Sequence, residues 1–135
     1  MDRIVAISDT ANAAIHALAL AHVNGGSISA REVAERLGIS PTYLAKIMQR
    51  LAAKGFLAPS RGLGGGYSLA KPAETISCLD VVVGLEGDIP RRECLFVKAI
   101  CRTRRCALRT FCEEVETQLR NALSCTTVSA VARSF

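Results

Sequence analysis

The chain has 135 residues, half of them hydrophobic, and its formal net charge at pH 7 is +5. This length suits one domain with an appended segment, and the positive charge favours an anionic partner, with nucleic acid as the first candidate. No apolar run approaches the about 18 residues of a membrane-spanning helix, and the N-terminus lacks a secretory signal pattern. We therefore expect a cytoplasmic protein without a membrane partner.

A first helix is predicted over residues 1–23, with Ser8 as its cap and two glycines, Gly25 and Gly26, at its end. Asp9 lies in the first turn, where the helix dipole favours a carboxylate, so stabilising this helix is its simplest structural role. One face of the helix is apolar and consists of Ala11, Ala14, Ile15, Leu18 and Ala19.

The stretch after the glycine pair predicts a winged helix-turn-helix. Ser29 and Glu32 form a capping box for a short helix that Gly38 ends. A second helix begins near Pro41, because Ser40 is a good N-cap and proline is tolerated in the first turn. Its apolar stripe consists of Leu44, Ile47, Met48 and Leu51. The opposite face is left to read or grip DNA and presents Thr42, Tyr43, Lys46, Gln49 and Arg50.

A β-hairpin wing is predicted after Gly55 ends the second helix. Residues 56–60 have strand character, and a glycine run over residues 62–66 leads tightly into residues 67–70. Arg61 at the tip suits a phosphate or the minor groove, whose negative potential attracts arginine. The alternative is a generic helical hairpin with a glycine-rich turn. The candidate DNA-binding residues are Ser40, Thr42, Tyr43, Lys46, Gln49, Arg50, Arg61, Gly62 and Gly65.

Two further helices are predicted in the second half of the chain. Ser77 caps the first, Asp80 answers it, and Gly84 and Gly87 limit its length. The second begins at Ala107 and has an apolar stripe at three-four spacing. That stripe consists of Leu108, Phe111, Val115, Leu119 and Ala122, and its spacing continues to Thr126. A second copy of the chain would bury the stripe, which predicts a homodimer, and packing back on the first helix is compatible with it.

Three cysteines lie in the segment between these helices, which has no clear period. Cys94, Cys101 and Cys106 have six and then four residues between them, so one loop can surround a polynuclear centre. Structural zinc sites usually contain a tighter cysteine pair, and iron-sulfur clusters are held by thiolates, so the pattern favours a cluster. Free redox thiols or incidental cysteines are the alternatives. The remaining cysteines, Cys78, Cys112 and Cys125, are interpreted as small buried hydrophobes.

The sequence resembles the Rrf2 family of winged-helix regulators, of which IscR and NsrR are members, over nearly its whole length. The resemblance rests on four segments: the first-helix segment ISDTANAAIHALALA, the recognition-helix segment SPTYLAKIMQRLAAKGFL, the wing SRGLGGGYSLAKPAETIS and the helix LDVVVGLEG. The three-cysteine loop that leads into the long helix completes the pattern.

The resemblance implies a homodimer on a double-stranded DNA operator, with an iron-sulfur cluster in each loop controlling DNA affinity. It implies Cys94, Cys101 and Cys106 as ligands. IscR-type members have a histidine three residues after the third cysteine, where this chain has Arg109. NsrR-type members use an aspartate from the partner's first helix, and Asp9 occupies the matching place. The resemblance to NsrR therefore favours a 4Fe-4S cluster completed by Asp9 of the partner subunit, with a 2Fe-2S cluster as the alternative.

We thus expect a mainly α fold, with a winged helix-turn-helix over residues 1–75 and a cluster loop with a long C-terminal dimerisation helix over residues 76–135. The expected function is a DNA-binding transcription regulator, a repressor, that senses nitric oxide, redox state or cluster supply. One alternative is a winged-helix regulator without a cluster, controlled by thiols or a partner protein. Another is an iron-sulfur electron-transfer or carrier protein, which leaves the DNA reader unexplained. The sequence contains no nucleophile-base constellation, so we expect no enzyme activity.

Overall fold

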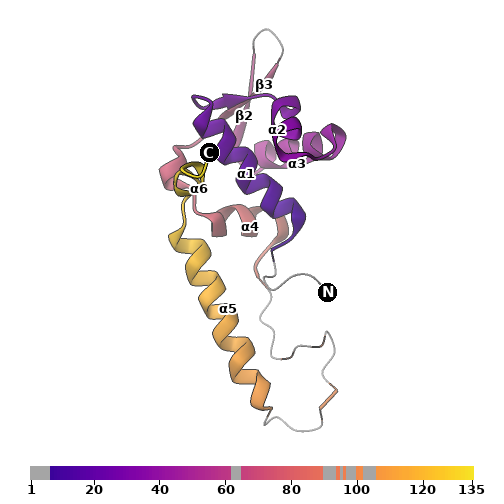
Figure 1. The fold of residues 1–135 in the computed structure, drawn as a ribbon, viewed down its shortest axis with the longest axis vertical. Coiled ribbons are helices and arrows are strands. Elements are labelled where there is room, and N and C mark those ends of the chain that lie inside the picture. Colours follow the sequence, from indigo (N-terminus) through magenta and orange to yellow (C-terminus); the bar gives the residue numbers. More distant parts are fainter. Residues whose placement is uncertain (1–6, 62–64, 90–93, 95, 97–99, 102–105) are drawn as a thin grey trace.

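The computed structural model describes residues 7–61, 65–89, 94, 96, 100–101 and 106–135. Helix α1 (Asp9–Val23) begins at the predicted cap, where the Ser8 hydroxyl accepts a hydrogen bond from the Ala11 amide at 3.0 Å. Residues 1–6 of the predicted helix lie outside the described part. The helix is buried on nearly every side and not on one face only, because other helices and the sheet surround it in the compact part of the molecule (Figure 1). Its many alanines allow these neighbours to approach closely.

The two helices of the predicted DNA-binding unit, residues 30–53, which with the wing we call the reader, have the predicted caps. Helix α2 (Ala30–Leu37) begins at a capping box: the Ser29 hydroxyl accepts from the Glu32 amide at 3.2 Å, and the Glu32 carboxylate accepts from the Ser29 amide at 2.9 Å. Helix α3 (Pro41–Ala53) begins after Ser40. The predicted apolar stripe of α3 is buried and consists of Leu44, Ile47, Met48 and Leu51.

The wing is an antiparallel hairpin of β2 (Leu57–Ser60) and β3 (Gly66–Leu69). A third strand, β1 (Ser27–Ile28), pairs with the other edge of β3, which gives the sheet order β1-β3-β2. The sequence did not predict β1. Because Ile28 is buried, this short strand joins the base of the wing to the core between α1 and α2.

A short 3-10 helix, η1 (Ala73–Thr75), leads into α4 (Cys78–Glu86), which begins at the predicted Ser77–Asp80 capping box. The prediction that Gly84 limits this helix is wrong, since Gly84 lies inside it. A Cβ atom at Gly84 would come within 2.8 Å of the Phe56 ring, so this glycine permits close packing of α4 against the start of the wing.

Helix α5 (Ala107–Cys125) extends away from the compact part as the longest helix of the described chain (Figure 1). The chain then breaks at Thr126 and forms a separate helix, α6 (Val128–Ala132), which the sequence did not predict. Helix α6 packs on α1, and α5 packs mainly against α4. Among the described residues, no helix is long and apolar enough to cross a membrane.

Candidate DNA interface and cysteine segment

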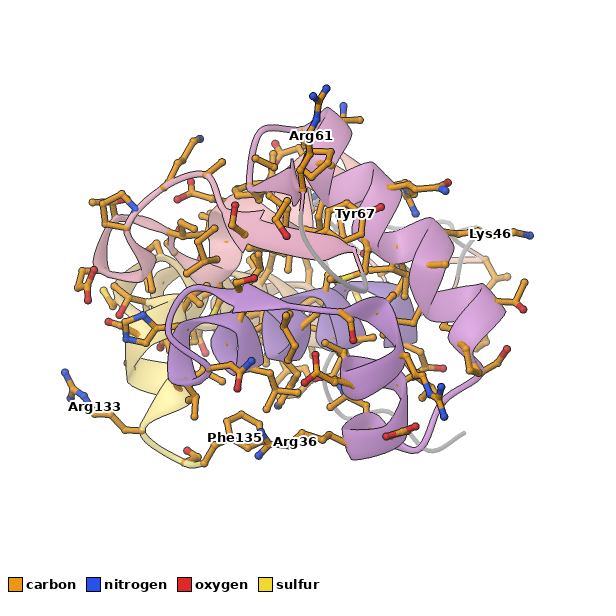
Figure 2. All side chains as sticks on the ribbon, turned by 90° about the horizontal axis from the view of Figure 1, so that it is seen from above. Arg36, Lys46, Arg61, Tyr67, Arg133 and Phe135 are labelled. Carbon is orange, nitrogen blue, oxygen red and sulfur yellow. The ribbon has the colours of Figure 1, made fainter. Side chains whose placement is uncertain are left out.

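The outer face of α3 has the side chains that the sequence assigned to it. Thr42, Tyr43, Lys46, Gln49 and Arg50 are all exposed, as is the cap residue Ser40. Lys46 points outward from α3 and Arg61 projects from the end of β2, so two cations lie on the surface of the reader (Figure 2). Gly65 is exposed and has φ +63°, which suits the turn of the wing. Gly62 lies outside the described residues.

Two of these candidate residues bind other helices in a way that the sequence did not indicate. The Tyr43 hydroxyl shares a hydrogen bond with the Thr10 hydroxyl of α1 at 2.7 Å. The Arg50 guanidinium donates to the Leu85 carbonyl near the end of α4. Arg50 is therefore directed toward α4 and not away from the protein, and a contact between Arg50 and DNA stays a prediction.

Other basic side chains of the reader are also engaged with the protein. Arg31 donates to Glu35 at 3.1 Å within α2. Arg36 lies over the ring of Phe135 at 5.8 Å from its centroid, and Figure 2 shows these two side chains together at the C-terminus. Lys46 and Arg61 are thus the cations of α3 and the wing that most clearly project away from the protein (Figure 2).

The start of α1 lies between the reader and the end of α4. Asp9, the first residue of the helix, is exposed. Its neighbour Thr10 bonds to Tyr43 of α3, and its other neighbour Ser8 donates to the Glu86 carboxylate at the end of α4. The predicted ligand Asp9 is therefore placed between two residues that bind neighbouring helices.

The cysteines predicted as cluster ligands are free thiols. Cys101 is exposed, Cys94 and Cys106 are half-buried, and Cys106 is the residue immediately before α5. Within the described residues, no group of three or more His, Cys, Asp and Glu side chains is placed to hold a metal ion. The predicted ligand set combines two protomers, and the structure describes one chain. Arg109, at the place of the IscR-type histidine, forms an ion pair with Glu113 at 3.0 Å.

The other three cysteines divide into two kinds. Cys78 and Cys112 are buried, as predicted, and burial raises the pKa of the Cys78 thiol, because a thiolate is poorly solvated there. Cys125 is exposed at the end of α5, so its interpretation as a buried hydrophobe is wrong. The three-four spacing of α5 does not turn Cys125 toward the core, which receives the neighbouring Leu123 instead.

The apolar stripe of α5 is only partly covered by its own chain. Leu108, Phe111 and Val115 are 50%, 54% and 42% exposed, whereas Leu119 packs against the core. Adjacent to this stripe, Arg120 holds the segment after α4 by donating to the Asp88 carboxylate at 2.9 Å and to the Ile89 carbonyl at 3.1 Å. The hydrogen bond that Arg120 donates to Asp88 raises the pKa of Arg120, so this cation is kept charged.

Comparison with known proteins identifies the family. A family model described as "Rrf2: Iron-dependent Transcriptional regulator" matches residues 7–134. The chain belongs to the Rrf2 family. This confirms the resemblance found in the sequence, and it makes the chain a member of a family of transcription regulators.

Individual Rrf2 proteins agree with this assignment. An HTH-type transcriptional regulator named YffB from Lactococcus lactis is 34% identical over 112 residues, covering 78% of this chain and 72% of YffB. IscR of Yersinia pseudotuberculosis is 26% identical over 113 residues, covering 84% of this chain and 69% of IscR. The crystal structure of Staphylococcus aureus CymR superposes with a TM-score of 0.75 at 26% identity, covering 93% of this chain and 96% of CymR.

The match to CymR confirms the mainly α winged helix-turn-helix fold that the sequence predicts. The similarity extends through α5 and α6 as well as the reader, since it includes nearly all of both chains. A closer relation to NsrR than to other Rrf2 members stays a prediction.

Proposed function

We propose that this Rrf2 protein is a cytoplasmic repressor that binds a double-stranded DNA operator as a homodimer, under the control of an iron-sulfur cluster, and that it has no enzyme activity. The observation that carries the proposal is the position of the three free cysteines, Cys94, Cys101 and Cys106. They lie between α4, whose end contacts α1 and α3, and α5, whose apolar stripe is exposed. A ligand held there lies at the start of the dimerisation helix, on the segment that connects it to α4.

The DNA-binding part of the proposal rests on the exposed face of α3 and on the wing. The first residues of a recognition helix meet base edges in the major groove, and here these are Thr42 and Tyr43, followed one turn on by Lys46. Arg61 extends beyond β2, where it reaches a phosphate or the minor groove. Residues 1–75 supply this reader, and residues 76–135 supply the sensor and the dimer contact.

The homodimer rests on α5. Leu108, Phe111 and Val115 form an apolar stripe along a helix that stands away from the compact part, and a second copy of the same helix covers such a stripe symmetrically (Figure 1). Two-fold symmetry then presents two copies of α3 to two operator half-sites.

The chemistry of the donors fits an iron-sulfur cluster. Thiolates are its usual protein ligands, and all three cysteines are free and at least partly accessible. Cys106 is the residue immediately before the first turn of α5. Asp9 of the partner subunit is the proposed fourth ligand of a 4Fe-4S cluster. When bound, such a cluster supplies iron that reacts with nitric oxide or oxygen.

The residues themselves convert this chemistry into a change in DNA affinity. Ligation by the loop of one protomer and by Asp9 of the other fixes the relative placement of the two readers, and its loss releases them. Asp9 would be the one oxygen ligand among three thiolates, and so the weakest of the four proposed ligands.

The test compares the wild-type protein with a variant in which Cys94, Cys101 and Cys106 are all replaced by Ala. We expect about four irons per monomer and a visible charge-transfer band after anaerobic purification of the wild type, and neither in the variant. The matched control is Cys125→Ala, which removes an exposed cysteine outside the set. DNA affinity, measured with a duplex selected from a random-sequence pool, should respond to nitric oxide in the wild type and the control only. Unchanged regulation in the triple variant would refute the proposal.

A regulator without a cluster is the second candidate, favoured by the similarity to CymR, which has also been solved in an oxidized form. In that case the free cysteines act as redox thiols. An iron-free protein whose affinity for the selected duplex changes on mild oxidation, and recovers with a thiol reductant, would support this candidate over the first.

A further inference from the structure

Contacts from the start of α1 and the end of α4 restrain both ends of the recognition helix α3. Near its first turn, the Tyr43 hydroxyl is bound to Thr10 at 2.7 Å. Near its last turn, the Arg50 guanidinium is bound to the Leu85 carbonyl. Ser8, two residues before Thr10, binds Glu86, so α1, α3 and α4 are joined pairwise by side-chain hydrogen bonds.

The Thr10–Tyr43 hydrogen bond lies between the proposed iron ligand and the proposed DNA contact. Thr10 follows Asp9 directly in the first turn of α1, and Tyr43 is the third residue of α3. Tyr43 is 39% exposed, so its ring lies partly at the surface that meets DNA. The bond therefore joins the neighbour of the proposed iron ligand to the part of the recognition helix that contacts bases.

We propose that Thr10 is a positioning residue that transmits ligation of Asp9 to the recognition helix through the hydroxyl of Tyr43. This inference rests on the proposed function. Ligation of Asp9 restrains the first turn of α1 and thus favours the conformers in which Thr10 holds Tyr43. Because Asp9 serves the loop of the partner subunit, the cysteines of one protomer act on the recognition helix of the other.

The test is the ratio of DNA affinities of the cluster-loaded and the cluster-free protein, measured by fluorescence anisotropy on the selected duplex. Thr10→Val removes the hydroxyl at nearly constant volume and should bring this ratio closer to one by about two- to tenfold, the contribution of one net hydrogen bond. Thr10→Ser keeps the hydroxyl and should restore the ratio. Thr117→Val on the exposed part of α5 is the matched control, since it makes the same replacement far from the reader.

Tyr43→Phe separates a role in transmission from a role in DNA contact. If Tyr43 only touches DNA, Tyr43→Phe weakens the loaded and cluster-free forms equally, and Thr10→Val changes neither. If the bond transmits ligation, the two variants reduce the ratio by the same factor, and the double variant reduces it no further. Thr10→Ala, which favours the helix, replaces Thr10→Val if that variant folds poorly.

A spectroscopic readout is independent of DNA. The chain has two tyrosines, Tyr43 and Tyr67, so the Tyr67→Phe protein contains a single phenol whose hydrogen bonding is followed by ultraviolet resonance Raman spectroscopy. Cluster loading should change this signal, and Thr10→Val should abolish the change. A loaded wild type whose affinity ratio differs from one, with an unaltered ratio in Thr10→Val, overturns the link and leaves the proposed function intact. A wild-type ratio of one overturns both.

Discussion

Replacing Phe111 by Ala should dissociate the proposed dimer. In the single chain Phe111 is 54% exposed on α5, between Leu108 and Val115. A phenylalanine has about 200 Å² to bury, so about 110 Å² remains for a partner. At about 25 cal/mol per Å², and after allowing for the methyl group that Ala retains, each protomer loses about 2 kcal/mol of association free energy.

Two-fold symmetry applies this loss twice, so the dissociation constant of the dimer should rise by about 100- to 1000-fold. Sedimentation equilibrium of the Phe111→Ala protein measures this directly. Affinity for a duplex with two half-sites should fall, while affinity for a single half-site should stay the same. Thr117→Ala is the control, because Thr117 is exposed and lies about 200° around the helix from Val115. Equal dissociation constants for wild type and Phe111→Ala would refute the assignment of this stripe to a dimer.

Three other substitutions test the reader, the packing of α4 and the buried thiol. Arg61→Ala should weaken operator binding and reduce the slope of log affinity against log salt by about one, and an unchanged slope would show that the wing does not contact phosphate. Gly84→Ala should destabilise the fold by about 1 kcal/mol, because overpacking against Phe56 exceeds the gain of about 1 kcal/mol in helix propensity; urea denaturation that showed stabilisation would contradict this. The raised pKa of Cys78 means that the native state keeps the proton. The contribution of the protonated thiol to the free energy of unfolding is complete below the ordinary thiol pKa of about 8.5, and it is lost as pH rises through the native pKa. Cys78→Ala should therefore flatten the decline of this free energy at alkaline pH. Identical declines in both proteins would exclude this role.

Helix beginnings were predictable because they depend on residues close together in the sequence. The caps at Ser8, Ser29, Ser40 and Ser77 all accept from an amide three residues on. A hydroxyl or carboxylate at that spacing is visible in the sequence, and it needs no tertiary contact. The exposed face of α3 was predictable for the same local reason.

Elements that depend on distant partners were missed. Strand β1 has only two residues and exists because it pairs with β3, about forty residues later. Gly84 was interpreted as a helix breaker because its partner, Phe56, is far away in the sequence. The break between α5 and α6 was hidden because the apolar spacing of α5 continues toward Thr126, whose carbonyl instead accepts from the Cys78 amide at 2.8 Å.

The candidate site was predictable in its residue types but not in its connections. The exposure of Tyr43 and Arg50 follows from helical spacing, whereas their bonds to Thr10 and Leu85 depend on how α1, α3 and α4 meet. The three cysteines and Asp9 remain a predicted set, because a ligand set shared between protomers cannot be read from one chain.

The hydrogen bonds at the base of α4 and the start of α6 have a topological consequence. The Cys78 amide donates to the Thr126 carbonyl, and the Val128 amide donates to the Ile76 carbonyl, each at 2.8 Å. The chain thus leaves the core beside the point at which it returns to it, and α4, which follows this point, packs on α1 and next to Phe56. Loops closed at such a base tolerate changes in length with little cost to the surrounding fold. The part of the chain between Ile89 and Leu119 can therefore change in length while α4 keeps its contacts with α1 and α3, and exchanging residues 90–118 between related proteins is the natural way to give the same DNA reader a different signal.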